Sequence, residues 1–284
     1  MTSKSLTEMG VSHNIVVEPQ EVENYQKAVK HWRLLTKVIP LDMSFKEKYE
    51  LCDDLGLAKS TGSGPARNFC WEHSLSEGHD WHWIMDDNIR HFCRLNKNER
   101  VNVKTSAFWR AMEDFVLRYK NVAMAGPHYR MFAPDRQKQP PFITNTRVYS
   151  CNLIRNDLPY RWRGRYNEDT ILSLDMLKGG WCTIQFKAFL QDKMPTQTIK
   201  GGNTDELYQG DTRSDGERYA KQGTVEKSQM LVREHPDVAS VVWRFGRIHH
   251  HVDYSCFKQK LLRKENIHIP KDVNDYGMSL RKTK

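Results

Sequence analysis

The sequence lacks both of the glycine-rich motifs with which many proteins bind nucleotide phosphates. No Gly-x-Gly-x-x-Gly follows the first predicted strand, and no Gly-x-x-x-x-Gly-Lys-Ser/Thr occurs anywhere in the 284 residues. These absences argue against a dinucleotide-dependent oxidoreductase and against a P-loop ATPase. With neither phosphate cradle present, a metal ion is the remaining way for this chain to hold a diphosphate.

Other absences narrow the class of protein further. No stretch approaches the ~18 apolar residues of a membrane span, and the beginning, Met-Thr-Ser-Lys-Ser, lacks the apolar centre of a signal peptide. The six cysteines are scattered without a Cys-x-x-Cys pair, and the cysteines and histidines at 70–93 do not have the usual zinc spacing. We therefore expect reduced thiols, a cytoplasmic protein and no membrane partner.

Acidic residues are the minority charge. The 35 Asp and Glu residues stand against 44 Lys and Arg, which gives a net charge of +9. This balance favours a polyanionic partner such as nucleic acid, although any soluble basic protein would share it. The 38% of hydrophobic and 11% of aromatic residues are sufficient for a globular core and atypical of a disordered chain.

The first half of the chain alternates short apolar runs with segments of helical periodicity. We predict strands at residues 13–17, 37–41, 81–85 and 121–125, and helices at 21–32, 45–55, 66–71 and 108–119. This rhythm predicts an α/β fold with a mainly parallel sheet flanked by helices.

The second half predicts a smaller mixed sheet. Its strands are expected at 149–154, 181–190 and 247–257, and its helices at 167–177 and 225–234. The polar residues 192–224 are expected to form a lid loop, and residues 258–284 a basic C-terminal extension.

Asp86, Asp87 and Asn88 end one of the apolar runs abruptly. Residues 81–88 read Trp-His-Trp-Ile-Met-Asp-Asp-Asn, which is a buried strand followed by two carboxylates and an amide. Ligands bind at the carboxyl ends of strands in open α/β sheets. Carboxylate and amide oxygens suit Mg²⁺ or Mn²⁺, which usually bind together with a substrate's phosphates. The same residues would also suit a turn or a helix cap.

Further candidate residues lie at or near the other strand ends of the first half. They are Glu18, Pro19, Asp42, Arg67 and Asn68. In a parallel sheet they would gather with Asp86 at one edge, where an acid can accept hydrogen bonds from a ribose or a base. The planar fork of Arg67 would suit a diphosphate. For Glu18 and Asp42, helix capping is an equally good interpretation.

Glu168 and Asp169 form a second acidic centre, at the start of a predicted helix. One of them could simply favour the helix dipole. Two adjacent acids that face a cleft could instead supply a general base, which removes a proton from a hydroxyl nucleophile during a displacement at a sugar carbon.

Two further groups have candidate roles. His249 and His250 belong to three consecutive histidines in a predicted strand, and one of them could complete a metal site as a neutral imidazole, although a surface or packed histidine is the simpler interpretation. Arg130, Arg161, Arg163 and Arg165 alternate with aromatic residues, a pattern that can hold phosphates and stack on bases. A solvated loop anchored by Trp162 is the alternative for the last three.

Five motifs together resemble the TET-associated glycosyltransferase family. They are Val-Glu-Pro, Ala-Arg-Asn-Phe, Trp-Ile-Met-Asp-Asp-Asn-Ile, Tyr-Asn-Glu-Asp-Thr and Phe-Gly-Arg-x-His-His-x-Val-Asp-Tyr. The resemblance covers residues 13–257. That family includes phage enzymes that add sugars to hydroxymethylated pyrimidines in DNA, and it is similar to the glucosyltransferase that completes base J. The resemblance implies a GT-A fold.

The resemblance also implies the reaction and its components. The donor would be a UDP-sugar held with Mn²⁺ or Mg²⁺ at Asp86, Asp87 or Asn88, with His249 or His250 as a further ligand. Asp169 or Glu168 would be the base of an inverting transfer to the hydroxymethyl group of 5-hydroxymethylcytosine in single- or double-stranded phage DNA. That base would have to leave the stack, and the positive charge would screen the DNA backbone.

The implied organisation is a single GT-A domain over residues 1–257, in the host cytoplasm during infection. Residues 13–125 would form the nucleotide-sugar half, residues 126–257 the acceptor and catalytic half, and 258–284 the extension. Two alternatives remain at this stage. One is a glycosyltransferase that acts on a glycan, lipid or protein, and the other is a non-enzymatic nucleic-acid-binding protein on the same fold.

Overall fold

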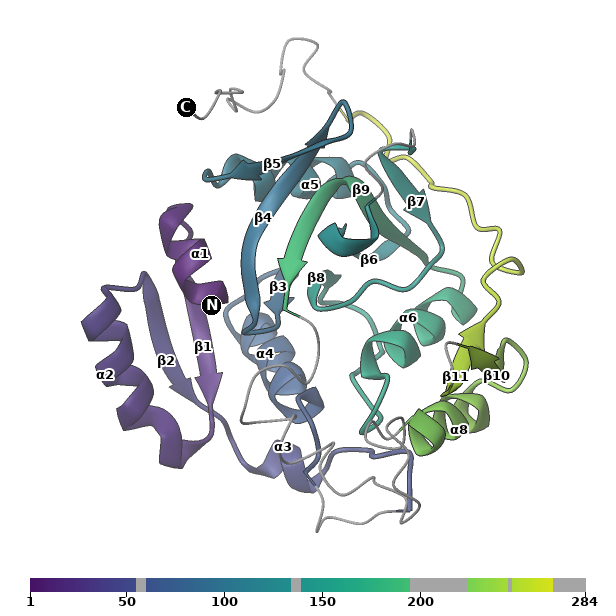
Figure 1. The fold of residues 1–284 in the computed structure, drawn as a ribbon, viewed down its shortest axis with the longest axis horizontal. Helices are drawn as coiled ribbons and strands as arrows, with labels where there is room; N and C mark the ends of the chain where they lie inside the picture. Colours follow the sequence, from purple (N-terminus) through teal and green to yellow (C-terminus); the bar gives the residue numbers. More distant parts are fainter. Residues whose placement is uncertain (55–59, 134–138, 195–223, 245–246, 268–284) are drawn as a thin grey trace.

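The computed structural model describes residues 1–54, 60–133, 139–194, 224–244 and 247–267 (Figure 1). Its centre is a seven-stranded sheet in the order β3-β8-β6-β9-β4-β5, with β7 paired to β9. The strands are β3 (Trp81–Met85), β4 (Ile89–Asn96), β5 (Glu99–Val103), β6 (Val122–Tyr129), β7 (Phe142–Thr144), β8 (Cys151–Arg155) and β9 (Cys182–Lys193). The α/β class is as predicted.

The sheet is mixed, however, and not mainly parallel as expected. Within it only β6 and β9 pair in parallel, and the other described pairings are antiparallel. One cause is the β4–β5 hairpin, which the sequence analysis missed. Its two-residue turn has Lys97 at φ 49° and Asn98 at φ 67°, and two successive left-handed residues form the type I′ turn that joins antiparallel strands.

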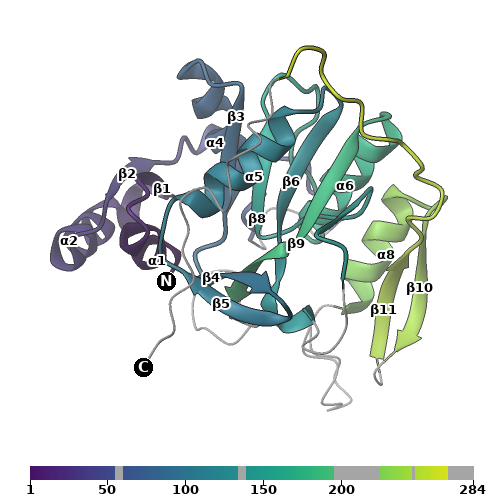
Figure 2. The ribbon, with the colours of Figure 1, turned by 90° about the horizontal axis from the view of Figure 1, so that it is seen from above.

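Helices cover both faces of the sheet. On one face lies α5 (Ala107–Leu117), whose Phe108, Met112 and Val116 are fully buried in the larger core cluster. On the other face lie α4 (Gly64–Ser76) and α6 (Glu168–Lys178), which share a second cluster with Trp162. Figure 2 shows α5 and α6 on opposite sides of β6, β8 and β9. The periodicity that predicted these helices reflects these two buried faces.

The first two predicted strands form a separate parallel pair. They are β1 (His13–Val17) and β2 (Thr36–Pro40), connected through η1 (Pro19–Glu21) and α2 (Val22–Trp32). A first helix, α1 (Thr2–Glu8), contacts β4, and a short α3 (Ser44–Glu47) precedes α4 (Figure 1). Thr2 connects α1 to the predicted metal loop, because its hydroxyl bonds the Asp86 carbonyl at 2.5 Å and accepts the Ile89 N–H at 3.0 Å.

The C-terminal part packs beside α6. Helix α8 (Thr224–Glu234) contacts the antiparallel hairpin of β10 (Ala239–Arg244) and β11 (Arg247–Val252). Most of the predicted lid, residues 195–223, lies outside the described residues, as do residues 268–284 of the predicted extension. Residues 258–267 run back to the end of α5, where Lys264 N–H bonds the Arg118 carbonyl at 2.8 Å.

The last two features of the fold concern the cysteines and the length of the helices. All six cysteines are free of disulfides. Within the described ranges, no helix combines the length and apolar character that a bilayer crossing requires.

Candidate functional site

Asp86 lies where β3 ends, with its backbone N–H bonded to the Ser150 carbonyl at 2.8 Å. Its two carboxylate oxygens have different cationic partners. Arg67 Nη2 lies 2.6 Å from Oδ1, and Lys193 Nζ lies 2.5 Å from Oδ2. Charge-assisted bonds of this length in a poorly solvated position are strong. The two cations outweigh the effect of burial and hold the pKa of Asp86 well below its usual range.

Arg67 joins this carboxylate to the second acidic centre. From α4 its Nη1 lies 2.9 Å from Asp169 Oδ1 and 3.3 Å from Glu168 Oε1. The guanidinium also lies 4.5 Å from the ring centroid of buried Trp162. The structure therefore brings together the Arg67, Asp86, Glu168 and Asp169 that the sequence analysis placed in separate motifs.

Asp169 differs from Asp86 in its proton affinity. It accepts hydrogen bonds from Asn152 Nδ2 at 3.2 Å and from Ser150 N–H at 3.3 Å. Burial raises the pKa of Asp169 to about 6; Arg67 opposes that rise, and the charges of Glu168 and Asp86 add to it. Two carboxylates whose environments shift their pKa values in opposite directions can take different roles in acid–base chemistry. Asp169 is the one suited to accept a proton near neutral pH.

Lys193 is a functional candidate that the sequence analysis missed. It is the last residue of β9, and its Nζ also bonds Ser150 Oγ at 2.9 Å. Ser150 Oγ in turn lies 2.6 Å from the Tyr129 hydroxyl, and the Tyr129 ring stacks on Tyr149 at 4.7 Å. The predicted strand stopped at residue 190, so nothing in the sequence distinguished this lysine from a surface residue.

Among the predicted metal ligands, Asp86 and Asn88 fit a divalent cation best. Asn88 Oδ1 is buried and accepts no hydrogen bond from the described residues, which makes it a hard oxygen donor two residues from Asp86. A cation on Asp86 Oδ2 would have to exchange with Lys193. Asp87 is exposed, and its charge acts on the amino terminus and on Tyr25.

His249 and His250 lie on β11, in the hairpin outside the main sheet. Burial, together with the charges of Lys227 and Arg147, lowers the pKa of His250 to about 3 and keeps its ring neutral. Within the described residues, no histidine joins Asp86 or Asp87 in a cluster of three potential metal ligands. Their role as metal ligands stays a prediction.

The other predicted donor-side residues have partners within the protein. Glu18 forms an ion pair with Lys46, and Pro19 begins η1. The Asp42 carboxylate accepts the Ser44 N–H at 2.9 Å in the turn before α3, whose N-cap residue is Met43. Asn68 forms two hydrogen bonds of 2.8 Å with the Trp162 backbone and thereby fixes the ring on which Arg67 lies.

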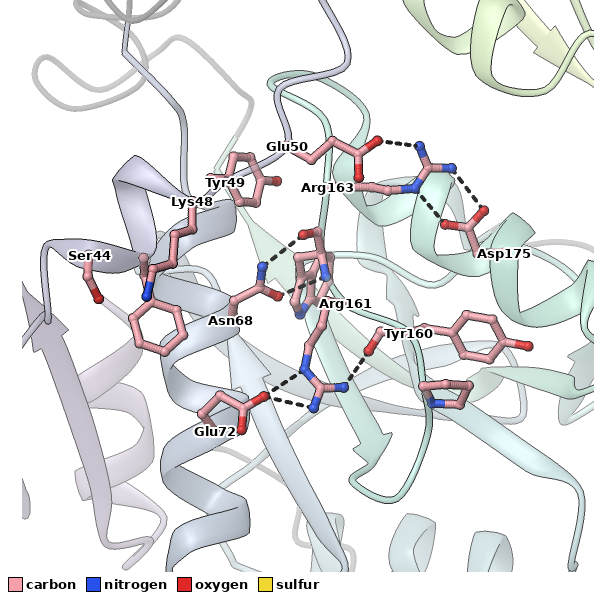
Figure 3. A pocket seen from close by; sticks show the side chains of 13 residues that line it. Ser44, Lys48, Tyr49, Glu50, Asn68, Glu72, Tyr160, Arg161, Arg163 and Asp175 are labelled. Atoms are coloured by element: carbon pink, nitrogen blue, oxygen red, sulfur yellow. Dashed lines mark hydrogen bonds and ion pairs between the residues drawn. The ribbon is translucent and has the colours of Figure 1, made fainter.

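Three of the four predicted DNA-binding arginines form close ion pairs with acidic residues of the protein. Arg161 pairs with Glu72 at 2.7 Å, and Arg163 with Asp175 at 3.0 Å. Both line an open cavity of about 520 Å³ between α3, α4 and residues 159–163 (Figure 3). Arg165 has 0% side-chain exposure and bonds Asp53 at 2.7 Å. This burial corrects the expectation that Arg165 contacts DNA phosphates.

Arg130 has a longer contact with its acidic partner. It lies in η2 (Arg130–Phe132), which follows β6, and its Nη1 is 3.6 Å from Asp192 Oδ1. Its side chain is 36% exposed, and its contact with DNA stays a prediction.

The sequence profile of the TET-associated glycosyltransferases matches residues 1–202, a range that contains Arg67, Asp86, Glu168, Asp169 and Lys193. The chain belongs to the TET-associated glycosyltransferase family. As a member, the protein is a glycosyltransferase, and its donor is a nucleotide sugar. Neither a curated protein nor a solved structure shows significant similarity to the chain.

Proposed function

We propose that this glycosyltransferase moves a sugar from a UDP-sugar to the hydroxymethyl group of 5-hydroxymethylcytosine in DNA, with inversion. One observation carries the proposal: Arg67 holds Asp86 and Asp169 together while their surroundings shift their pKa values in opposite directions. A leaving group and a nucleophile need such a division of roles, because one gains negative charge while the other loses a proton.

The proposed chemistry assigns the proton acceptor to Asp169. Its carboxylate takes the proton of the acceptor hydroxyl, and the hydroxyl oxygen attacks the anomeric carbon. The bond from that carbon to the phosphate oxygen breaks, and UDP leaves with the electron pair. A single displacement of this kind inverts the anomeric centre. Glu168, which accepts a bond of 3.3 Å from Ser63 Oγ, would strengthen the basicity of Asp169 through its charge.

The cationic side chains beside Asp86 would stabilise the departing UDP. Arg67 supplies a planar fork of donors suited to a diphosphate, and Lys193 supplies a compact point charge beside it. Asp86 and Asn88 would hold a divalent cation, which neutralises the diphosphate when bound. Within a GT-A-like arrangement, the β1–β2 unit and this loop would form the donor side, since Thr2 ties the loop to α1.

The positive charge of the protein supports DNA as the acceptor. The chain carries a net charge of +9, and Arg130 is partly exposed next to the Tyr129–Ser150–Lys193 hydrogen bonds. Phosphate contacts from such residues supply affinity that falls with salt. A glycan or lipid acceptor would not need this charge.

The test is mass analysis of nucleosides after incubation with a panel of UDP-sugars and Mn²⁺. Oligonucleotides with 5-hydroxymethylcytosine should yield a nucleoside heavier by one sugar residue, whereas the same sequence with cytosine should be unchanged. Release of UDP without any modified nucleoside would point to a different acceptor and contradict the proposal.

A further inference from the structure

Two neighbouring apolar side chains are exposed where β6 ends. In η2, Met131 is 53% and Phe132 is 57% exposed. Large apolar side chains that stand together at a surface frequently mark an interaction site. We call Met131 and Phe132 the apolar knob.

The knob is held by a contact of its own ring and by the residue that follows it. The Phe132 ring packs edgewise on Tyr129, with a centroid distance of 5.8 Å. After it, Ala133 is buried, donates to the Arg130 carbonyl at 3.2 Å, and accepts a hydrogen bond from Arg100 on β5. The knob is thus presented on a fixed turn, which lowers the entropy cost of using it in binding.

The knob borders the acidic centre. Tyr129, on which Phe132 packs, bonds Ser150 Oγ at 2.6 Å, and Ser150 Oγ bonds Lys193 Nζ at 2.9 Å. Lys193 then bonds Asp86 at 2.5 Å. A short chain of contacts therefore connects the knob to the place where transfer is proposed.

The surroundings of the knob are cationic. Arg90 and Arg130, with side chains 47% and 36% exposed, lie on either side of one buried carboxylate, Asp192, at 2.9 and 3.6 Å. His91 contacts the same carboxylate, and nearby Lys187 lies 3.0 Å from His128. One buried acid does not balance two arginines, so this face attracts anions.

We propose that the apolar knob is a wedge that enters the base stack of duplex DNA and that Arg90 and Arg130 bind the flanking phosphates. The proposal rests on the proposed DNA acceptor. A base that reacts inside an enzyme has to leave the stack, and proteins unstack bases by inserting side chains such as Phe and Met between base steps. The combination of an apolar tip with flanking cations fits this partner because a duplex offers apolar base faces between rows of phosphates.

The test compares the double variant Met131→Ala/Phe132→Ala with wild type on two substrates that differ only in pairing. On a fully paired duplex with 5-hydroxymethylcytosine, kcat/KM should fall at least about tenfold, since the variant lacks the wedge that offsets unstacking. On single-stranded or mismatched DNA the loss should shrink to about twofold, because the target base there is already loosened.

Fluorescence of a 2-aminopurine next to the target gives an independent reading. Wild type should raise it on binding, and the double variant should not. Leu117→Ala is the matched control, because Leu117 is a 43% exposed apolar residue at the end of α5, outside the proposed sites, and should leave both readouts unchanged. For Arg90→Gln and for Arg130→Gln, the slope of log DNA affinity against log salt concentration should become shallower by about one.

The outcomes separate the wedge from the proposed function. If wild type modifies no DNA, the proposed function fails and the wedge fails with it. If wild type modifies duplex DNA and the double variant does so at the same rate, or is equally impaired on single strands, only the wedge is overturned. Loss of binding to phosphatidylglycerol vesicles with unchanged DNA activity would assign the knob to a membrane and also overturn the wedge. A thermal shift by UDP-sugar that matches wild type verifies that the variant is folded.

Discussion

Replacement of Arg67 by Met should be the most destabilising single change at the acidic centre. Arg67 contacts Asp86 at 2.6 Å, Asp169 at 2.9 Å and Glu168 at 3.3 Å. Methionine fills similar space but cannot donate, so three poorly solvated carboxylates would face one another without the guanidinium that contacts each of them. Loss of one partner from a buried ion pair typically costs ~3–5 kcal/mol.

This loss is large against a total stability of ~5–15 kcal/mol. At ~2 °C per kcal/mol for a chain of this length, Tm should fall by roughly 6–10 °C, as measured by calorimetry at pH 7.5. Arg110→Met, which removes an exposed arginine of α5, is the matched control and should change Tm by less than ~1 °C.

The effect should depend on pH in a defined direction. In wild type the pKa of Asp86 is lowered, so its contribution to stability is present at neutral pH and lost only as pH falls through the folded-state value. In the variant the unpaired carboxylates bind protons more readily, so the Tm difference from wild type should shrink between pH 7 and pH 4. Adding Asp169→Asn should restore part of the loss. A Tm change below ~2 °C, or one independent of pH, would refute the view that Arg67 neutralises this cluster.

Three other predictions follow from the same contacts. Because the pKa of Asp169 is raised to about 6, log kcat/KM should rise with unit slope up to about pH 6 and then level off, and a flat profile between pH 5 and 8 would contradict its role as base. Thr2→Val removes the hydroxyl that links the Asp86 carbonyl to Ile89 N–H; calorimetric titration should show weaker UDP-sugar binding, whereas Thr2→Ser should behave as wild type. Arg165→Met removes the guanidinium that pairs with the Asp53 carboxylate, so Tm should fall by several degrees. The dependence of DNA affinity on salt concentration should stay unchanged. A weaker salt dependence would show that Arg165 contacts DNA phosphates after all.

The elements that the sequence predicts well have a strong local signal. The predicted strand 81–85 has the bounds of β3, because an apolar run that stops at Asp86 fixes both strand and end. The stripe of Phe108, Met112 and Val116 similarly identifies α5. Arg67 and Asp169 were found because each lies near the start of a recognisable helix. Arg67 was expected beside Asp86 from the order of elements, whereas its contact with Asp169 was not predicted.

The missed features depend on partners that are distant in sequence. Strand β4 has polar residues among its apolar ones because one of its surfaces carries Arg90 and His91 around Asp192, and its turn lacks the Asn-Gly signal of many hairpins. Lys193 gains its role from Asp86, 107 positions away. Arginines interleaved with aromatic residues resemble a phosphate-binding loop, yet Arg165 forms an ion pair with Asp53, 112 positions away in the sequence. Local pattern cannot distinguish an arginine that meets DNA from one that meets a buried acid.

The most direct test of the account is the rate of sugar transfer in Asp169→Asn compared with Asp80→Asn. Asp80 is exposed and immediately precedes β3, whereas Asp86 lies at the opposite end of the same strand, so Asp80→Asn controls for the loss of one negative charge. With saturating UDP-sugar, Mn²⁺ and hydroxymethylated DNA, we predict that Asp169→Asn is slower by ~10²–10⁴-fold and that Asp80→Asn equals wild type. An Asp169→Asn variant that keeps more than about a tenth of the wild-type rate would contradict the assignment of the transfer site to this centre.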